Sequence, residues 1–260
     1  MVHPFTRRGQ VGNKLLDTLP DEEYEHLLPD LEQTSFSFDE CIYESSERLN
    51  YAYFPTTSVV SLVYTMLDGA SAEMGMVGNE GLIGVALLTG GETSSNRAIA
   101  QHAGGVIKMK ASAFRKEFRR GGSFQRFLLR YIQALLTQIS QRAVCNGLHS
   151  IEQRLACWLL MTHDRVESEK LRITQEFVSN LLGARREWVS LTTGSLRDKG
   201  IVVCNRGYIT ILDRAGLEAT ACECYRVIKD EYDRLLDLRT SLSRPSVYAT
   251  SRSSRSVAAI

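Results

Sequence analysis

The sequence lacks any long apolar run. No stretch of its 260 residues approaches the about 18 uninterrupted apolar residues of a membrane span, and residues 1–13 lack the apolar core of a secretory signal. Cysteine is also sparse, because six residues scattered between positions 41 and 224 are too few for a disulfide scaffold in a chain of this length. We therefore expect a cytoplasmic protein with reduced thiols and no membrane partner.

Signatures of common enzyme classes are missing as well. The chain has no G-x-x-x-x-G-K-[ST] phosphate loop, no G-x-S-x-G nucleophile turn and no H-E-x-x-H metal helix. A metalloenzyme built on a β-barrel needs closely spaced histidines, whereas His102 stands alone in the β-rich part of the sequence. We expect no enzyme activity, no catalytic residue and no metal site.

The charge is distributed unevenly, although its sum is only +1. Eleven acidic residues and no lysine or arginine lie from Asp17 to Glu47, while nine basic residues and a single acidic one, Glu117, lie from Lys108 to Arg142. An ordinary solvated helix face explains most such runs. A polyanion would nevertheless be steered toward the later part of the chain.

Hydrophobic periodicity divides the chain into regions. Residues 14–31 predict two short helices broken by Pro20 and Pro29. Short β-rich runs at 41–45, 51–54, 58–65, 72–77 and 105–110, separated by glycine-containing turns, then predict a β-roll. Residues from about 149 to 238 are expected to form a second domain, and residues 239–260 a disordered Ser/Arg-rich tail.

A long helix is predicted between these regions, at residues 122–148. Its apolar residues recur at spacings of four, three and four, which is typical of a heptad seam between two copies of a helix. The seam consists of Leu128, Ile132, Leu135 and Ile139. Because it spans only about two heptads, a helix that lies on its own β-roll is an open alternative.

Residues 171–213 carry the functional signal. Thr174 is a suitable N-cap for a helix that ends at Leu182, Gly183 permits a sharp turn, and a second helix is predicted from Arg185 to Lys199. Two apolar runs around a three-residue hairpin connection at 205–207 follow. The segment therefore predicts a helix-turn-helix with a β-wing.

The second helix offers side chains suited to DNA. Arg186 can bridge two acceptors of a guanine, and Glu187 can accept from a cytosine amino group. Other basic residues are better suited to phosphates, which position the protein without reading sequence. The candidate DNA-binding residues are Arg186, Glu187, Thr174, Arg185, Ser190, Arg197, Lys199 and Arg206.

With these motifs, residues 12–213 resemble the Crp/Fnr family of transcription regulators. The matching stretches include YFPTTSVVSLV and GNEGLIG in the β-roll. The resemblance implies an α+β chain: an N-terminal β-roll, or cyclic-nucleotide-binding-like jelly roll (12–121), a long dimerisation helix (122–148) and a C-terminal winged helix-turn-helix (149–238). It also implies a homodimer on palindromic double-stranded DNA and RNA polymerase as a partner. Leu191 and Trp188 depart from the family pattern, which puts the half-site preference in doubt.

The effector pocket departs further. Family members that bind a cyclic nucleotide hold its ribose with a Gly-Glu pair and its phosphate with an Arg-Ser or Arg-Thr pair, whereas here Glu80 is displaced by one residue and no hydroxyl follows Arg97. The candidate pocket residues are Gly78, Glu80, Gly81 and Arg97. A cyclic nucleotide is the candidate effector to be tested, and a vestigial roll without an effector is the alternative. Cys41 alone cannot hold the iron–sulfur cluster of oxygen-sensing members.

Two further pairs contain metal-binding residue types. Cys222 and Cys224 form a C-x-C pair, and Cys145 lies four residues before His149. Either pair could bind a metal or sense redox state, but buried packing is the usual role of such cysteines. The function predicted by the whole sequence is a sequence-specific regulator. The alternative is a signalling or scaffold module whose winged domain binds protein.

Overall fold

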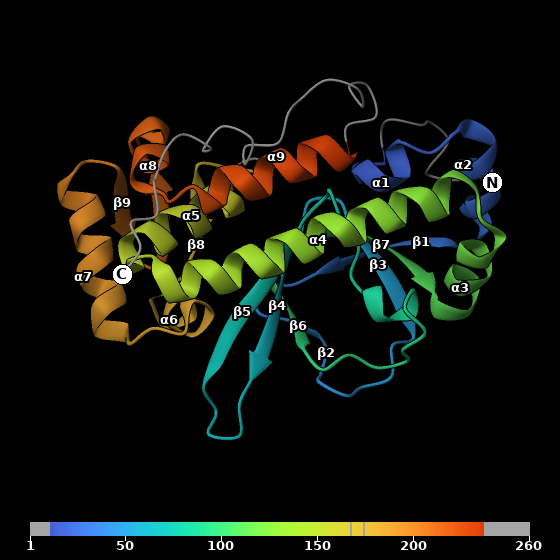
Figure 1. The fold of residues 1–260 in the computed structure, drawn as a ribbon, viewed down its shortest axis with the longest axis horizontal. Helices are drawn as coiled ribbons and strands as arrows, with labels where there is room; N and C mark the ends of the chain where they lie inside the picture. The colour runs from blue at the N-terminus through green and yellow to red at the C-terminus, as the bar shows by residue number, and fades with distance from the viewer. Residues whose placement is uncertain (1–10, 167, 174, 237–260) are drawn as a thin grey trace, which may run out of the picture.

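The computed structural model describes residues 11–166, 168–173 and 175–236 (Figure 1). A β-roll and a helix-turn-helix region lie along one long helix, α4 (Gly122–Leu148). This arrangement confirms the predicted α+β fold class. Among the described residues, no helix combines the length and apolarity that a membrane crossing requires.

Two short helices open the described chain, as predicted. The side chain of Asn13 caps α1 (Lys14–Asp17) by accepting hydrogen bonds from the next turn, and α2 (Asp21–Leu27) starts after Pro20. A 3-10 turn, η1 (Leu28–Asp30), follows. Leu16 and Leu19 have no accessible surface, so these helices close one end of the roll core.

The roll consists of two antiparallel sheets. The first has the order β1-β7-β3 and the second β2-β6-β4-β5. Their strands are β1 (Leu31–Phe36), β2 (Cys41–Tyr43), β3 (Tyr51–Pro55), β4 (Val59–Thr65), β5 (Ser71–Val77), β6 (Arg97–His102) and β7 (Gly104–Lys110), with the 3-10 turn η2 (Val85–Leu87) between β5 and β6. Alternating apolar side chains such as Phe54, Val60 and Ile107 fill the space between the sheets.

Two helices lead away from the roll. Helix α3 (Ala111–Arg120) packs Phe114 into the roll core, and the chain then turns at Gly121 into α4. The first turn of α4 is capped from α2, because Glu23 accepts hydrogen bonds from the backbone N–H groups of Ser123 (3.0 Å) and Phe124 (2.9 Å). This carboxylate satisfies donors that a helix N-terminus would leave unpaired.

Replacing Glu23 with Gln should weaken this cap. Burial would raise the pKa of Glu23, but the hydrogen bonds from Ser123 and Phe124 outweigh it and lower the pKa below 4.5. The cap therefore stabilises the protein above that pH and is lost as the pH falls through the lowered pKa. We expect Glu23→Gln to cost about 1 kcal/mol at pH 7 and to match wild type at an acidic pH below the lowered pKa. Urea unfolding at both pH values, with the exposed Glu25→Gln as control, measures this; an equal loss at both would contradict it.

The C-terminal part begins with α5 (Ile151–His163), which a capping box between Ser150 and Gln153 initiates. The helix-turn-helix and a small sheet of order β8-β10-β9 follow. The remaining elements are β8 (Lys170–Arg172), α6 (Gln175–Leu182), α7 (Arg186–Asp198), β9 (Val202–Asn205), β10 (Tyr208–Ile211), α8 (Arg214–Thr220) and α9 (Cys224–Leu236). Helix α9 runs back beside α4 (Figure 1).

Candidate DNA-binding site

Helices α6 and α7 meet at a tight turn. Gly183 has φ +58°, a left-handed conformation that glycine adopts without steric cost. Val189 and Leu196 of α7 are buried against the other helices, and Thr193 is buried between them. Because this side of α7 is buried, the opposite side of the helix faces solvent.

The exposed side of α7 presents the predicted base-reading residues. Arg185, Arg186, Glu187 and Ser190 are all exposed, and the structure assigns no side-chain cap to the helix start at Arg185. Trp188 and Leu191 are exposed as well, by 55% and 66%. The two departures from the family pattern are therefore exposed to solvent, as Arg186 is.

Two of the predicted phosphate-binding residues already have protein partners. Lys199 Nζ lies 2.8 Å from Glu152 Oε1, and the same carboxylate accepts a hydrogen bond from Ser195 at 2.9 Å. These bonds, with Lys199 contributing most, lower the pKa of Glu152. Arg197 bonds to the adjacent Asp198 at 3.0 Å. Lys199 therefore holds the end of α7 to α5 in this structure. Thr174 lies outside the described residues.

The wing has a tighter turn than predicted. Asn205 pairs directly with Tyr208, so only Arg206 and Gly207 form the loop, and the predicted three-residue connection is wrong. Both loop residues have positive φ, +44° and +82°, as in type I′ hairpin turns, which match the twist of the strands. Arg206 is exposed at the tip. The third strand, β8, was not predicted.

Comparisons with known proteins agree with this geometry. Residues 153–220 match the family model of the Crp-like helix-turn-helix domain. FixK2 from Bradyrhizobium japonicum has a TM-score of 0.64 at 21% identity, over 74% of this chain and 98% of FixK2. The chain has the Crp/Fnr regulator fold and carries a Crp-like helix-turn-helix domain.

Other solved structures share the Crp/Fnr fold. A Crp/Fnr-family regulator from Eubacterium rectale has a TM-score of 0.64 at 15% identity, covering 79% of this chain and 96% of that one. CLP, a c-di-GMP-responsive global regulator of Xanthomonas campestris, has a TM-score of 0.59 at 12% identity, covering 75% of this chain and all of CLP (100%). No curated protein sequence matches the chain.

The basic segment 108–142 begins far from the Crp-like helix-turn-helix domain (Figure 1). Helix α3, with Arg115, Lys116 and Arg119, lies at the opposite end of the long axis from α7 (Figure 1). The length of α4 separates them.

The predicted dimer seam on α4 requires correction. Leu128 and Leu135 are buried within their own subunit, where Leu135 and Ile139 approach β5, and Ile132 and Ile139 are only partly exposed. Side chains with so little accessible surface contribute little to a contact with a second copy. The alternative of a helix lying on its own roll agrees with the contact of Leu135 with β5. The exposed apolar residues of α4 are Leu129, Leu136, Val144 and Leu148.

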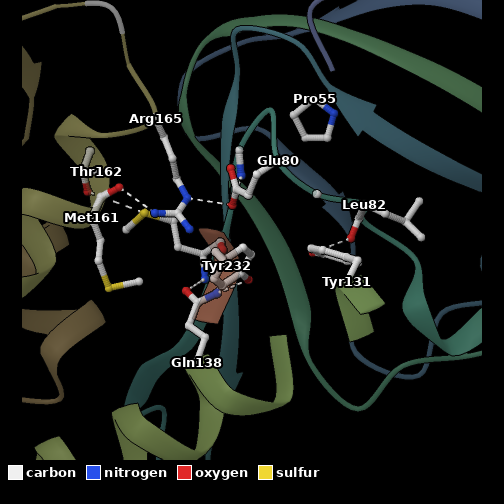
Figure 2. Close-up of polar contacts among 12 residues, drawn as sticks. Pro55, Glu80, Leu82, Tyr131, Gln138, Met161, Thr162, Arg165 and Tyr232 are labelled. Atoms are coloured by element: carbon white, nitrogen blue, oxygen red, sulfur yellow. Dashed lines mark hydrogen bonds and ion pairs between the residues drawn. The ribbon is translucent and has the colours of Figure 1, made fainter. Parts of the chain in front are cut away.

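Of the predicted effector residues, Gly78 and Glu80 share a hydrogen bond, whereas Arg97 has a partner elsewhere on the roll. Glu80 Oε1 lies 2.8 Å from Arg165 Nε, beyond the end of α5, and both side chains are only 9% exposed (Figure 2). Gly81 lies against the ring of Tyr131. Arg97 instead pairs with Glu44 at 3.4 Å on the second sheet. Glu80 therefore links the roll to the Crp-like domain.

A chain of hydrogen bonds continues this link to α9. Gln138 accepts from the N–H of Met76 (3.1 Å), donates to the Met76 carbonyl (3.1 Å) and donates to Tyr232 Oη (2.8 Å). The guanidinium of Arg165 lies 5.7 Å from the centre of the Tyr232 ring (Figure 2). No local sequence pattern marks Gln138, Arg165 or Tyr232, because their contacts join residues 85 or 94 positions apart.

Proposed function

We propose that the chain is a sequence-specific DNA-binding transcription regulator that binds palindromic sites as a homodimer. The observation that carries the proposal is the exposed first turn of α7, which presents Arg186 and Glu187 on a helix anchored by buried Val189 and Leu196. Within the part of the chain that the structure describes, neither Arg186 nor Glu187 has a side-chain partner. A side chain free of internal bonds can reach base edges without breaking any.

These side chains determine which DNA bases the helix would recognise. Arg186 would donate two hydrogen bonds to guanine O6 and N7, and Glu187 would accept from a cytosine amino group. Exposed Arg206 on the wing and Arg185 before α7 would contact phosphates. In a dimer, two copies of α7 would enter successive major grooves about 34 Å apart.

The exposed apolar side of α4 supports the homodimer. Leu129 and Leu136 are one heptad apart and exposed by 50% and 53%, and Val144 lies about two turns further along. Residues seven apart lie on one face of a helix, as two-stranded helical contacts require. The proposed seam is thus shifted by one residue from the one that the sequence predicted.

In-vitro selection of duplex DNA from a random pool tests the function. We expect wild type to enrich a palindrome, and Arg186→Ala and Glu187→Ala each to lose about 1–3 kcal/mol of discrimination at one position of each half-site. Arg119→Ala on the distant α3 is the matched control. If no sequence is enriched and any DNA binding is insensitive to salt, the alternative of a scaffold module whose winged domain binds protein would be favoured.

Cyclic AMP should have little effect on this binding. The family's ribose contact needs a free carboxylate, whereas Glu80 is buried and paired with Arg165. We expect the change in operator affinity to stay below the about fivefold that a typical allosteric coupling produces. Titration of operator binding with cyclic AMP measures this, with c-di-GMP in parallel because CLP responds to it. A larger response to cyclic AMP would show that the Glu80–Arg165 pair opens.

A further inference from the structure

Four residues of metal-ligating type converge where α9 meets the end of α4. Cys145 and His149 lie on and just after the last turns of α4, and Cys222 and Cys224 lie just before and at the start of α9. Their ligand atoms all lie within 4.8 Å of one another. The Cys145 and Cys222 Sγ atoms are 3.5 Å apart, and Cys224 Sγ is 3.4 Å from His149 Nδ1.

The distances of 3.5 Å between Cys145 and Cys222 and 3.4 Å between Cys224 and His149 are close to ligand–ligand distances around a single tetrahedral ion. Zinc–sulfur bonds of about 2.3 Å place two thiolate ligands of one tetrahedron about 3.8 Å apart. Cys145 lies in the last turn of α4 and His149 follows the helix as its C-cap, while the C-x-C pair supplies the other two ligands. Three sulfurs and one imidazole nitrogen form the Cys₃His set of structural zinc sites.

The surroundings favour a closed site. Cys145 and Cys224 have no accessible surface, Cys222 is 5% exposed and the His149 side chain is 15% exposed. Such enclosure leaves no open coordination position for a substrate, which is typical of a structural ion.

Outer contacts orient two of the four ligands. Glu223 Oε2 lies 3.4 Å from His149 Nε2, so the carboxylate can hold the proton on that nitrogen and leave Nδ1 free to bind metal. Gln141 donates a hydrogen bond to Cys224 Sγ at 3.2 Å, an arrangement that stabilises a thiolate. Ordinary packing of cysteines requires neither contact.

We propose that Cys145, His149, Cys222 and Cys224 bind one Zn²⁺ ion that fastens α9 and its preceding turn to the end of α4. Binding replaces the protons of the three thiols, which are released to solvent, while His149 binds as neutral imidazole. The ion would join segments that are 77 residues apart and so fix α9 over the link between the roll and the helix-turn-helix. The site is independent of the proposed DNA-binding function.

Metal analysis of the full-length protein, purified under reducing conditions and dialysed against micromolar Zn²⁺, tests the proposal. We expect about one zinc per chain, as a four-ligand mononuclear site implies. Cys224→Ser and His149→Ala should lose it, while Cys41→Ser, an exposed cysteine in the roll, should retain it. Wild type without metal, or with a Cys145–Cys222 disulfide in its place, would overturn the proposal. So would iron together with sulfide.

Cobalt substitution provides a second test, which does not depend on variants that lose a ligand and do not fold. Co²⁺ bound to wild type should give the intense visible bands of a tetrahedral thiolate site and the near-ultraviolet charge transfer of cobalt–sulfur bonds. His149→Cys, which preserves four ligands, should still bind and should shift these bands. A Co²⁺ spectrum of octahedral type, or one unchanged by His149→Cys, would overturn the assignment. No readout in this test uses DNA.

Discussion

Arg165→Met is expected to lower the free energy of unfolding by about 3–5 kcal/mol, because it removes one partner of a buried ion pair. Burial alone would lower the pKa of Arg165, but Glu80 outweighs it and raises that pKa. In the variant, the buried Glu80 carboxylate keeps the N–H of Gly78 at 3.2 Å and loses its cation. Burying a carboxylate without a counter-charge is costly.

A double-mutant cycle separates this effect from lost packing. Glu80→Gln alone should also destabilise, and the double variant should cost less than the sum of the two single ones, because neither side chain is then left as an unpaired charge. Arg48→Met, at an exposed pair with Glu92, is the matched control and should stay within about 0.5 kcal/mol of wild type. Urea unfolding at pH 7 gives all four values. A loss below 1 kcal/mol for Arg165→Met would contradict a tightly coupled pair.

The second large effect is expected from Leu129→Glu combined with Leu136→Glu. Both side chains are exposed in the subunit, so the change should leave each subunit folded and place charges in the proposed dimer contact. A monomer reaches only one half-site at a time. Operator affinity should therefore fall by about 10²- to 10⁴-fold, the gain that linking two binding events commonly provides.

Sedimentation and DNA titration with full and half operators should agree. We expect wild type to sediment as a dimer and prefer the full palindrome, whereas the double variant should sediment as a monomer and bind both DNAs equally weakly. Leu67→Glu is the matched control, since Leu67 is a fully exposed leucine in the turn between β4 and β5. If the double variant remains dimeric, the dimer interface does not lie on this face of α4.

Local signals explain why the helix-turn-helix could be predicted from sequence. Gly183 and Gly200 stand where the backbone has positive φ, and the apolar residues of α7 repeat at helical spacing around buried Val189 and Leu196. Each of these features depends on neighbours within a few residues. The same holds for the breaks at Pro20 and Pro29.

Features that depend on partners distant in sequence were missed. The inward-facing residues of strand β6 include the small Ala98 and Ala100. Alanine is a weak strand former, so the alternation of apolar and polar residues that marks a strand is faint in this segment. Strand β1 was hidden because Leu31 continues the leucine spacing of the preceding helix. The face of α4 that is covered depends on α9, which lies about 90 residues further along, and heptad spacing cannot reveal that.

The position of α9 also constrains the order in which the molecule can be completed. Tyr232 and Ile228 of α9 are buried, and Tyr232 ends the hydrogen-bond chain that starts at Met76 in the roll. During synthesis, α9 leaves the ribosome after every other described element, so α4 emerges with the surface that α9 will cover still open to water. A nascent chain with roll and helix-turn-helix complete therefore exposes the surface of α4 around Tyr131 and Gln138 until α9 covers it.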